Sequence, residues 1–503
     1  MSANTYTDYS RDRIGWFFGL SGQQLAILAG ASLPVFWALQ QQAWAHVLVF
    51  LAVFGFVFLV TVVSIQGRPA VGWLWASGCH LFAGLTGARR FTSRAAQGRA
   101  DSLDDVDLPG VLQGVQVHDG PPAGPAQSRT AIIQNHAART WAVTAAVVHP
   151  GIGMSDAAER NRQAAGLTSL LDLASRGELI DEVIFMVRTV PDDGAERSVW
   201  VARHRVPDAS PLARQVNDDL QRHLSAASVR TEAFVTIVVP ETRIARQARA
   251  SGGRLEGRAR VLYGLMGEVE AQLRAAMAMT DVRWLTSPEL ALACRTGFAP
   301  ADRAGVIDAA AEHTRNPQVN PDVPWAMAGP SSADTAVRHY SHDAWDSVSA
   351  TIKLPAKGAV IGALAPVLTP AEPGERRSFM VAFPILGQAA AERTSDNAEF
   401  AADMGDELRR RAGVKAKARH RNDASKAHAM DEKLARGNAL IRPYAVCCVT
   451  VPRTAGIGEY GRRLDGCVRR AGFAPLRLDL AQDAGFAAAT IPLGISLSRG
   501  SGA

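Results

Sequence analysis

Three residues in the middle of the chain have the types and spacing that a metal ion could use. His339, His342 and Asp343 would offer two imidazoles and one carboxylate, which are common zinc ligands. No Cys or His pair stands nearby to complete a set of four ligands. We therefore interpret these residues as exposed polar side chains that lead into a strand, and we predict no metal site and no cofactor.

The five cysteines lack the spacing of a metal or disulfide framework. Their number is odd and their positions are irregular, which fits a reducing compartment and argues against a secreted domain held by disulfides. Cys447 and Cys448 are adjacent on a predicted strand, so their side chains point to opposite faces. We interpret both as small buried apolar residues. The full set is Cys79, Cys294, Cys447, Cys448 and Cys467.

Local catalytic motifs are absent from the sequence. It contains no G-x-x-x-x-G-K-[ST], no dinucleotide glycine motif after a strand, no G-x-S-x-G and no H-E-x-x-H. A loop that cradles phosphate needs those glycines and that lysine to offer backbone N–H groups and a positive charge. We expect a protein that is not an enzyme. A membrane-tethered enzyme, such as a transferase, stays open as an alternative, because a site assembled from distant residues leaves no local motif.

The elements that would position any site begin with an apolar N-terminal region. Residues 43–65 carry no formal charge, and about 20 apolar residues are enough for a helix to cross the hydrocarbon core. Residues 20–39 are also uncharged, although Gln23, Gln24 and Pro34 make them less apolar. We predict a two-helix transmembrane hairpin with crossings at about 20–39 and 43–65.

A third apolar segment, residues 71–88, is short for a crossing and contains His80. We predict that it forms a helix in the membrane interface, with tryptophans at headgroup depth and basic residues near anionic lipid. The predicted membrane-interface residues are Trp16, Trp73, Trp75, Arg89, Arg90 and Arg94.

The net charge of +6 is concentrated at this end of the chain. Residues 1–100 hold seven arginines against two aspartates, so the remaining residues are nearly neutral. A nucleic-acid binder that spreads its basic residues over a whole domain is not indicated by this distribution. Arginines flank the hairpin on both sides. The positive-inside rule therefore predicts a multi-pass protein of the cytoplasmic (inner) membrane with both termini in the cytoplasm.

Beyond the membrane end, the sequence has an α+β pattern. Apolar runs predict eight strands, at residues 141–149, 180–190, 231–239, 281–285, 345–354, 378–386, 444–451 and 475–480. Capping residues and apolar stripes predict helices between them, among them 156–176, 257–279, 287–297 and 456–471.

This order of strands and helices is that of a ferredoxin-like α/β sandwich. Val-Pro at the ends of strands 231–239 and 444–451 indicates that the sandwich is repeated. The fold class we predict is a membrane-anchored α+β protein with a transmembrane hairpin followed by ferredoxin-like repeats. The predicted organisation is a membrane region at 1–95, a linker at 96–130, a first α+β block at 131–300, a linker at 301–340 and a second block at 341–503. Whether the two blocks form one domain or two stays open.

The second block includes a long predicted helix at about 396–436 that is strongly basic. Residues 407–436 hold ten basic against four acidic side chains. Such a run is typical of a solvated helix face, but it also suits contact with an acidic partner protein, lipid headgroups or nucleic acid. The candidate contact residues are Arg409, Arg410, Arg411, Lys415, Lys417, Arg419 and Arg421.

Several short motifs resemble those of a known class of membrane proteins. The runs RIGWFFGLSGQQLAILA, DLPGVLQGVQVHDG, WAVTAAVVHPGIGM and RTVPDDG resemble actinobacterial integral membrane proteins of conjugative, type IV secretion-like gene clusters. The hairpin is similar to that of the PrgI/VirB-three class of conjugation membrane subunits. The soluble part is similar to the non-catalytic N-terminal region of the conjugation ATPase, the VirB-four class, including the basic helix and the closing IPLG. We expect the nucleotide-binding half of that ATPase to be missing, and no catalytic residue carries over.

The resemblance implies a scaffold or assembly subunit at the inner-membrane gate of a translocation machine. Such a subunit would dock a secretion or conjugation ATPase and other membrane subunits in a hetero-oligomeric complex. An EccE-like membrane component of type VII secretion is the related alternative, because it also has two N-terminal helices followed by a soluble α+β domain. Direct nucleic-acid binding, and whether DNA or protein is translocated, stay open.

Overall fold

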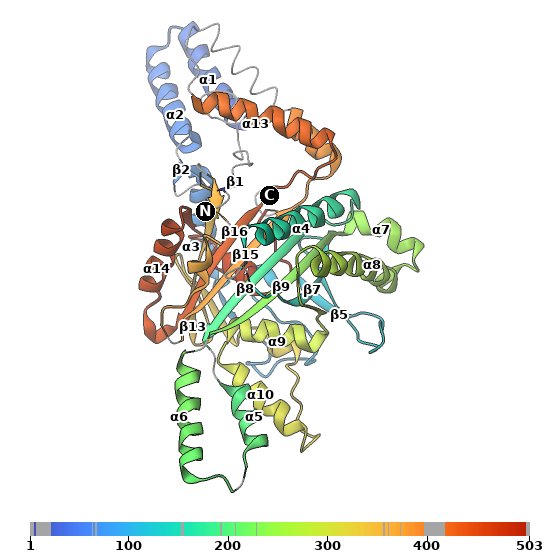
Figure 1. Ribbon diagram of the computed structural model, residues 1–503. Coiled ribbons are helices and arrows are strands. Elements are labelled where there is room, and N and C mark those ends of the chain that lie inside the picture. The colour runs from blue at the N-terminus through green and yellow to red at the C-terminus, as the bar shows by residue number, and fades with distance from the viewer. Residues whose placement is uncertain are drawn as a thin grey trace. The chain divides into compact units, whose positions relative to one another are not determined.

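The computed structural model divides the chain into two compact units (Figure 1). The sheet unit contains Met1–Tyr6, Arg89–Ile385 and Pro443–Ala503, and the helical unit contains Thr7–Ala88 and Leu386–Arg442. The structure describes all residues except 1–4, 7–21, 63, 66–67, 152–154, 192–193, 207, 228, 356–357, 361, 373, 397–417 and 499–503.

The sheet unit is built on one antiparallel sheet of 13 strands. Its main path runs β4-β11-β12-β13-β16-β15-β8-β9-β7-β6-β5, while β10 pairs with β7 and β17 pairs with β13. The mixed α+β class predicted from the sequence is thereby confirmed. The strands are β4 (Arg90–Thr92), β5 (Val115–Asp119), β6 (Ala131–Asn135), β7 (Thr140–Val148), β8 (Glu182–Pro191), β9 (Val229–Pro240), β10 (Asp281–Trp284), β11 (Ser332–Thr335), β12 (Tyr340–His342), β13 (Trp345–Lys353), β15 (Arg376–Pro384), β16 (Tyr444–Pro452) and β17 (Ala474–Arg477).

Both predicted α+β blocks contribute to this sheet. Strands of the first block lie in the order β10-β7-β9-β8, and strands of the second lie in the order β17-β13-β16-β15. The two sets meet where β8 pairs antiparallel with β15, with Met186 opposite Met380. We call this pairing the seam. The strands of both blocks form one continuous sheet inside the sheet unit, while Leu386–Arg442 of the predicted second block belongs to the helical unit.

Hydrophobic clusters cover opposite faces of the sheet, because side chains along a strand alternate between its two faces. One cluster packs α9 (Ser287–Phe298) and α15 (Gln482–Thr490) against strand residues that include Met380. The other packs α14 (Ile457–Arg470) against strand residues that include Val449. The seam is therefore part of a core rather than a surface contact.

Helix boundaries follow local capping signals. The Asp156 carboxylate accepts a hydrogen bond from the Glu159 N–H at 2.7 Å, which opens α4 as predicted. Thr286 and Glu289 form a capping box at the start of α9, and Pro288 stands in its first turn. The other helices of this unit are α4 (Ala157–Arg176), α5 (Ala195–His204), α6 (Pro211–Ala227), α7 (Glu241–Ala250), α8 (Arg254–Ala275), α10 (Asp302–His313) and α11 (Trp325–Ala328).

Two segments expected as linkers are built into the sheet unit. Residues 96–130 contain β5 and the 3₁₀ helix η1 (Gly110–Leu112), and they bury Leu108 and Leu112 in the core. Residues 301–340 contain α10, α11 and β11. The sequence indicates linkers here because a composition rich in Pro, Gly and Asp is typical of loops. A few apolar residues within these segments nevertheless pack into the core.

In the helical unit, α1 (Gly22–Gln40) and α2 (Trp44–Val62) pack as a hairpin. The Gln24 side chain donates a hydrogen bond to the Thr61 carbonyl at 2.9 Å, which brings the start of α1 to the end of α2. By length and composition α2 can cross a membrane, a property that signal sequences share, while the apolar part of α1 is shorter. The short hairpin of β2 (Ser64–Ile65) and β3 (Arg68–Pro69) then leads into α3 (Ala70–Thr86).

An N-terminal strand belongs to the sheet unit. β1 (Thr5–Tyr6) pairs antiparallel with β14 (Ala359–Val360), with Thr5 opposite Val360. The helices α1, α2 and α3 are therefore inserted in the chain between two segments of the same unit, β1 and β4.

Removing the central side chain of the seam should lower the stability of the protein. Met380 is fully buried, so Met380→Ala should leave a cavity and lower the free energy of unfolding by about 2–5 kcal/mol. Chemical denaturation of the purified protein in detergent measures this change. Met327→Ala is the control, because Met327 is 54% exposed and its loss should change stability by less than about 0.5 kcal/mol. Equal effects of the two substitutions would contradict the buried seam.

Candidate functional site: a buried arginine cluster

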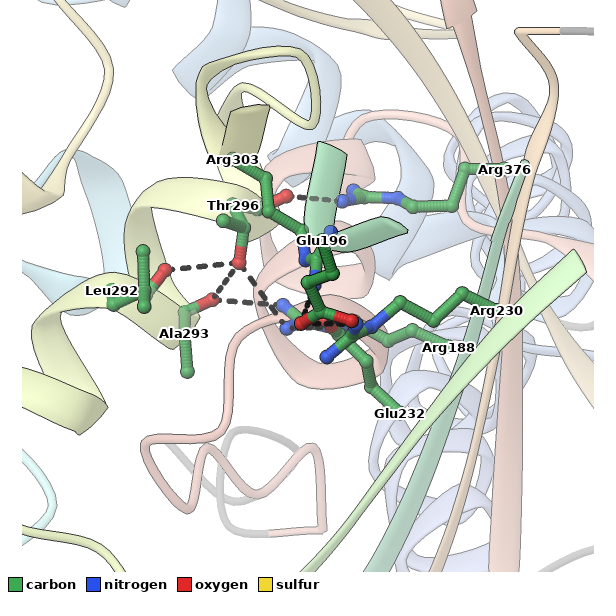
Figure 2. Close-up of polar contacts among 9 residues, drawn as sticks. All are labelled: Arg188, Glu196, Arg230, Glu232, Leu292, Ala293, Thr296, Arg303 and Arg376. Atoms are coloured by element: carbon green, nitrogen blue, oxygen red, sulfur yellow. Dashed lines mark hydrogen bonds and ion pairs between the residues drawn. The ribbon is translucent and has the colours of Figure 1, made fainter. Parts of the chain in front are cut away.

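Charged side chains gather beside the seam (Figure 2). Arg188 of β8 and Arg376 of β15 are each only 1% exposed. Arginine is rarely buried to this extent, because removing a guanidinium from water costs several kcal/mol unless it is paired and hydrogen-bonded. We call Arg188, Arg376 and their acidic neighbour Glu232 the arginine cluster.

The two Nη atoms of Arg188 have both backbone and side-chain partners. Its Nη1 donates to the carbonyl oxygens of Ala293 at 2.8 Å and Thr490 at 3.1 Å. Its Nη2 lies 2.5 Å from Glu232 Oε2, and the guanidinium carbon stands 4.9 Å from the ring centroid of Phe234. The side chain thus contacts β9, α9 and α15 at once.

Arg376 bonds the end of α9. Its Nη1 donates to the Thr296 carbonyl at 2.7 Å, and its Nη2 donates to the Gly297 carbonyl. The last carbonyls of a helix lack partners within it and carry partial negative charge, so a cation is stabilised there. Arg376 comes from the second block, and α9 belongs to the first. Arg188 comes from the first block, and Thr490 ends α15 of the second. Each arginine therefore bonds a helix of the other block.

One carboxylate faces the two guanidinium groups. Glu232 lies directly opposite Arg188 in the ladder between β8 and β9. Burial alone would raise the pKa of Glu232, but Arg188, with help from Arg230 and Arg376, holds it below its usual value. Glu232 is therefore ionised and balances one of the two buried positive charges, while the helix-end carbonyls stabilise the other.

An alternating row of charges leads from Glu232 to the surface (Figure 2). Arg230 Nε lies 3.6 Å from Glu232 Oε1, and Arg230 Nη1 lies 2.9 Å from Glu196 Oε1. Arg303 of α10 also reaches Glu196, at 2.6 Å. Since Glu196 stands in the first turn of α5, the row ties α5 and α10 to the sheet. The outer pairs are more exposed and each contributes little stability.

His342, one of the candidate metal ligands, is a core residue. Its Nδ1 lies 2.7 Å from the Phe298 carbonyl and its Nε2 lies 2.8 Å from Ser347 Oγ. Burial, and then repulsion from Arg376, lowers the pKa of His342 to about 3, so the ring is neutral. The interpretation of His342 as an exposed residue is wrong, because both ring nitrogens have partners inside the protein.

Asp343, its neighbour, is also bound by protein groups. Its carboxylate accepts from Arg295 Nη1 at 3.1 Å and from the Ser331 N–H at 2.7 Å. Among the residues that the structure describes, no three His, Cys, Asp or Glu side chains are grouped so as to hold a metal ion.

Two cysteines neighbour the cluster, and both are buried as thiols. Burial raises the pKa of Cys294 to about 12, and it also raises the pKa of Cys448. Cys447, on the opposite face of the same strand, has its pKa raised to about 12 by burial and by Cys448. A neutral thiol is a poor nucleophile and a poor metal ligand. The interpretation of Cys447 and Cys448 as buried residues is confirmed.

The chemistry available to the arginine cluster is that of fixed charge. Burial and repulsion from Arg188 lower the pKa of Arg376 below its usual value, but guanidinium groups stay protonated in proteins. Glu232 stays ionised for the reasons given above. Groups in these states hold elements together or bind an anion.

Several predicted membrane-interface residues have defined surroundings. On α3, Trp75 is 76% exposed and Trp73 is half-buried. Near β4, Arg89 and Arg90 both pair with Asp334, at 3.0 and 3.6 Å, within the sheet unit. The structure thus brings two predicted lipid-facing arginines together on one acid. Arg94 is exposed, and Trp16 lies outside the described residues.

The predicted basic contact residues fall mostly outside the described chain. Helix α13 (Ala418–Ala435) contains Arg419 and Arg421, whose side chains are not described. The remaining ones, Arg409, Arg410, Arg411, Lys415 and Lys417, precede that helix and lie outside the described residues.

Sequence reasoning missed the arginine cluster. Arg376 precedes the predicted strand 378–386, and Arg188 lies near the end of an apolar run, where a charge suggests a solvent-facing position. The signal that could have found Arg188 is its register, because Ile184, Met186 and Arg188 share one face of β8. An arginine in line with two large apolar residues on an inner strand must have buried partners.

Comparisons with known proteins assign no family to the chain. No protein-family model matches it, and no curated protein matches it either.

The arginine cluster predicts that removing the charge of Glu232 lowers the free energy of unfolding. Glu232→Gln would leave two buried guanidinium groups without a carboxylate, and breaking a buried pair in this way costs about 3–5 kcal/mol. Because the pKa of Glu232 is lowered on folding, its contribution is complete above the usual value of 4.5 and is lost as pH falls below it.

Chemical denaturation at pH 7 and at pH 3.5 measures both effects. The difference between wild type and Glu232→Gln should be large at pH 7 and smaller at pH 3.5. Glu268→Gln is the control, because Glu268 is exposed on α8. An equal difference for Glu232→Gln at the two pH values would contradict the assignment of an ionised, buried carboxylate.

Proposed function

We propose that this chain is a non-catalytic scaffold subunit at the inner-membrane gate of a conjugative, type IV secretion-like translocation machine. Its sheet unit would dock the ATPase and other membrane subunits on the cytosolic face. The motifs from RIGWFFGLSGQQLAILA to IPLG support the type of machine. The observation that carries the scaffold role is that the membrane-length helix α2 is inserted in the chain between β1 and β4, two segments of the sheet unit.

The strand pairing of the N-terminus supports a membrane topology. Since β1 pairs with β14, β1 and the part of the sheet unit that follows α3 would lie on the same side of a membrane. The chain between them would then cross an even number of times. With three apolar helices in this segment, α1 and α2 would cross and α3 would lie in the interface. The arginines on both sides of the hairpin favour a cytoplasmic location for that shared side under the positive-inside rule.

We also propose that the two four-stranded sets are ferredoxin-like repeats. Numbering the strands of each set along the chain, both have the order 4-1-3-2 with antiparallel neighbours, which is the order of the split βαβ motif. The first set has α4 and α8 after its first and third strands, and in the described part of the second set α14 follows the third strand in the same way. The seam would then join two copies of one unit.

The topology can be tested with single cysteines in a Cys79→Ser background, because Cys79 is exposed. Gln42→Cys, in the turn between α1 and α2, should react with a membrane-impermeant maleimide in intact cells. The matched control Gln127→Cys, exposed in the sheet unit, should react only after permeabilisation. Labelling of Gln127→Cys in intact cells would contradict an even number of crossings with a cytosolic sheet.

The scaffold role can be tested by affinity purification from membranes in mild detergent. We expect an ATPase of a conjugation apparatus to co-purify at a fixed ratio, with a control purification from cells lacking the tag recovering none. Recovery of a type VII secretion ATPase would assign the chain to that system instead. A lone monomer that binds a nucleotide-sugar would contradict the scaffold and favour a tethered transferase.

A further inference from the structure

The sheet unit has a strongly basic corner away from the arginine cluster. α7 and α8 lie side by side as a helical hairpin that follows β9 (Figure 1). Its residues 241–260 contain six arginines, two glutamates and no lysine. The arginines are Arg243, Arg246, Arg249, Arg254, Arg258 and Arg260. A local charge of +4 in 20 residues stands out in a soluble part that is nearly neutral as a whole.

Three of these six arginines hold the hairpin in place. Each of them forms an ion pair with a carboxylate and also donates a hydrogen bond to a backbone carbonyl. The ion pairs are Arg243 with Asp181, Arg258 with Glu241 and Arg260 with Glu256. Arg258 also lies 5.0 Å from the ring of Trp141 on β7, so the base of the hairpin is fixed to the sheet.

The other three arginines face water. Arg246, Arg249 and Arg254 are all exposed, and within the described part of the chain their side chains have no ion pair or hydrogen bond. Arg246 and Arg249 lie one helical turn apart on α7, and Arg254 is the first residue of α8. Their charges are therefore available to a partner.

Close packing of the two helices keeps these charges at one corner. A Cβ atom on Gly257 would lie 2.2 Å from the Ala248 carbonyl oxygen, so only glycine permits this approach of α8 to α7. The connection turns tightly through Gly252 and Gly253, whose φ angles are +115° and +70°. The arginines of α7 thus stay next to those that open α8.

The composition of the corner favours a phosphate polymer over a membrane surface. Arginine offers a planar fork of donors that matches phosphate oxygens. Interfacial helices insert large apolar or aromatic residues into lipid. The exposed residues between the arginines are instead small or polar, among them Gln247, Ala250 and Gly252, and none of residues 241–260 is an exposed large hydrophobic side chain.

We propose that the corner formed by Arg246, Arg249 and Arg254 binds the phosphate backbone of a nucleic acid, without reading its sequence. Contacts of this kind depend on charge and weaken as salt rises, because counterions are released from the phosphates. This inference rests on the α7–α8 hairpin alone, and it does not require the scaffold role.

The test uses the full-length protein in non-ionic detergent and a labelled 20-nucleotide oligodeoxythymidylate. Fluorescence anisotropy across several salt concentrations gives the affinity and its salt slope. Three proteins are compared: wild type, the corner variant R246Q/R249Q/R254Q, and the control variant R338Q/R462Q/R469Q. The control removes the same charge from three exposed arginines elsewhere in the sheet unit. Thermal unfolding of all three checks that they fold alike.

We expect the corner variant to bind at least tenfold more weakly than wild type and the control. The slope of log affinity against log salt should become shallower by about 2, since each phosphate contact to a single strand contributes about 0.7. Equal losses in both variants, or no binding by wild type, would overturn the proposal. A corner-dependent response to short-chain phosphatidylglycerol, with no corner-dependent response to the oligonucleotide, would assign the corner to lipid and also overturn it.

Discussion

The antiparallel pairing of β8 with β15 is the constraint on which the rest of the sheet unit depends. It joins two four-stranded sets edge to edge, so neither set leaves that edge open to other chains. It also gives the buried arginines partners in both blocks, because Arg188 donates to the Thr490 carbonyl of one block and Arg376 donates to the Thr296 carbonyl of the other. If the blocks separated, two guanidinium groups would lose partners in the core. The cluster therefore couples the stability of each block to the presence of the other.

Long helical insertions leave the sheet unit between its strands. The apolar helices α1, α2 and α3 stand between β1 and β4, the pair α5–α6 stands between β8 and β9, and the segment with α13 stands between β15 and β16. A rigid frame with variable insertions is the usual way in which proteins separate stability from contact with partners. In the role we propose, the frame would hold the insertions while the membrane and the other subunits bind them.

Much of this fold could be predicted from the sequence, because apolar runs and caps are local signals. The predicted strand 141–149 corresponds to β7, the predicted strand 444–451 to β16, and the predicted helix 456–471 to α14. The seam and the arginine cluster could not be predicted. Which edges meet depends on contacts between residues about 190 positions apart, such as Met186 and Met380, and no local pattern encodes them. His342 was misjudged for the same reason, since its partner Phe298 is distant in sequence.

The most direct test of this account is native-state hydrogen exchange of the amides in β8 and β15. If the two blocks form one cooperative sheet, the central amides of both strands should exchange only through global unfolding, with the same free energy of opening. The free energy of opening should also fall by the same amount in both strands when Glu232→Gln weakens the arginine cluster. Exchange of β15 at a distinctly lower free energy than β8, with β8 unaffected, would show that the blocks open independently and would contradict the account.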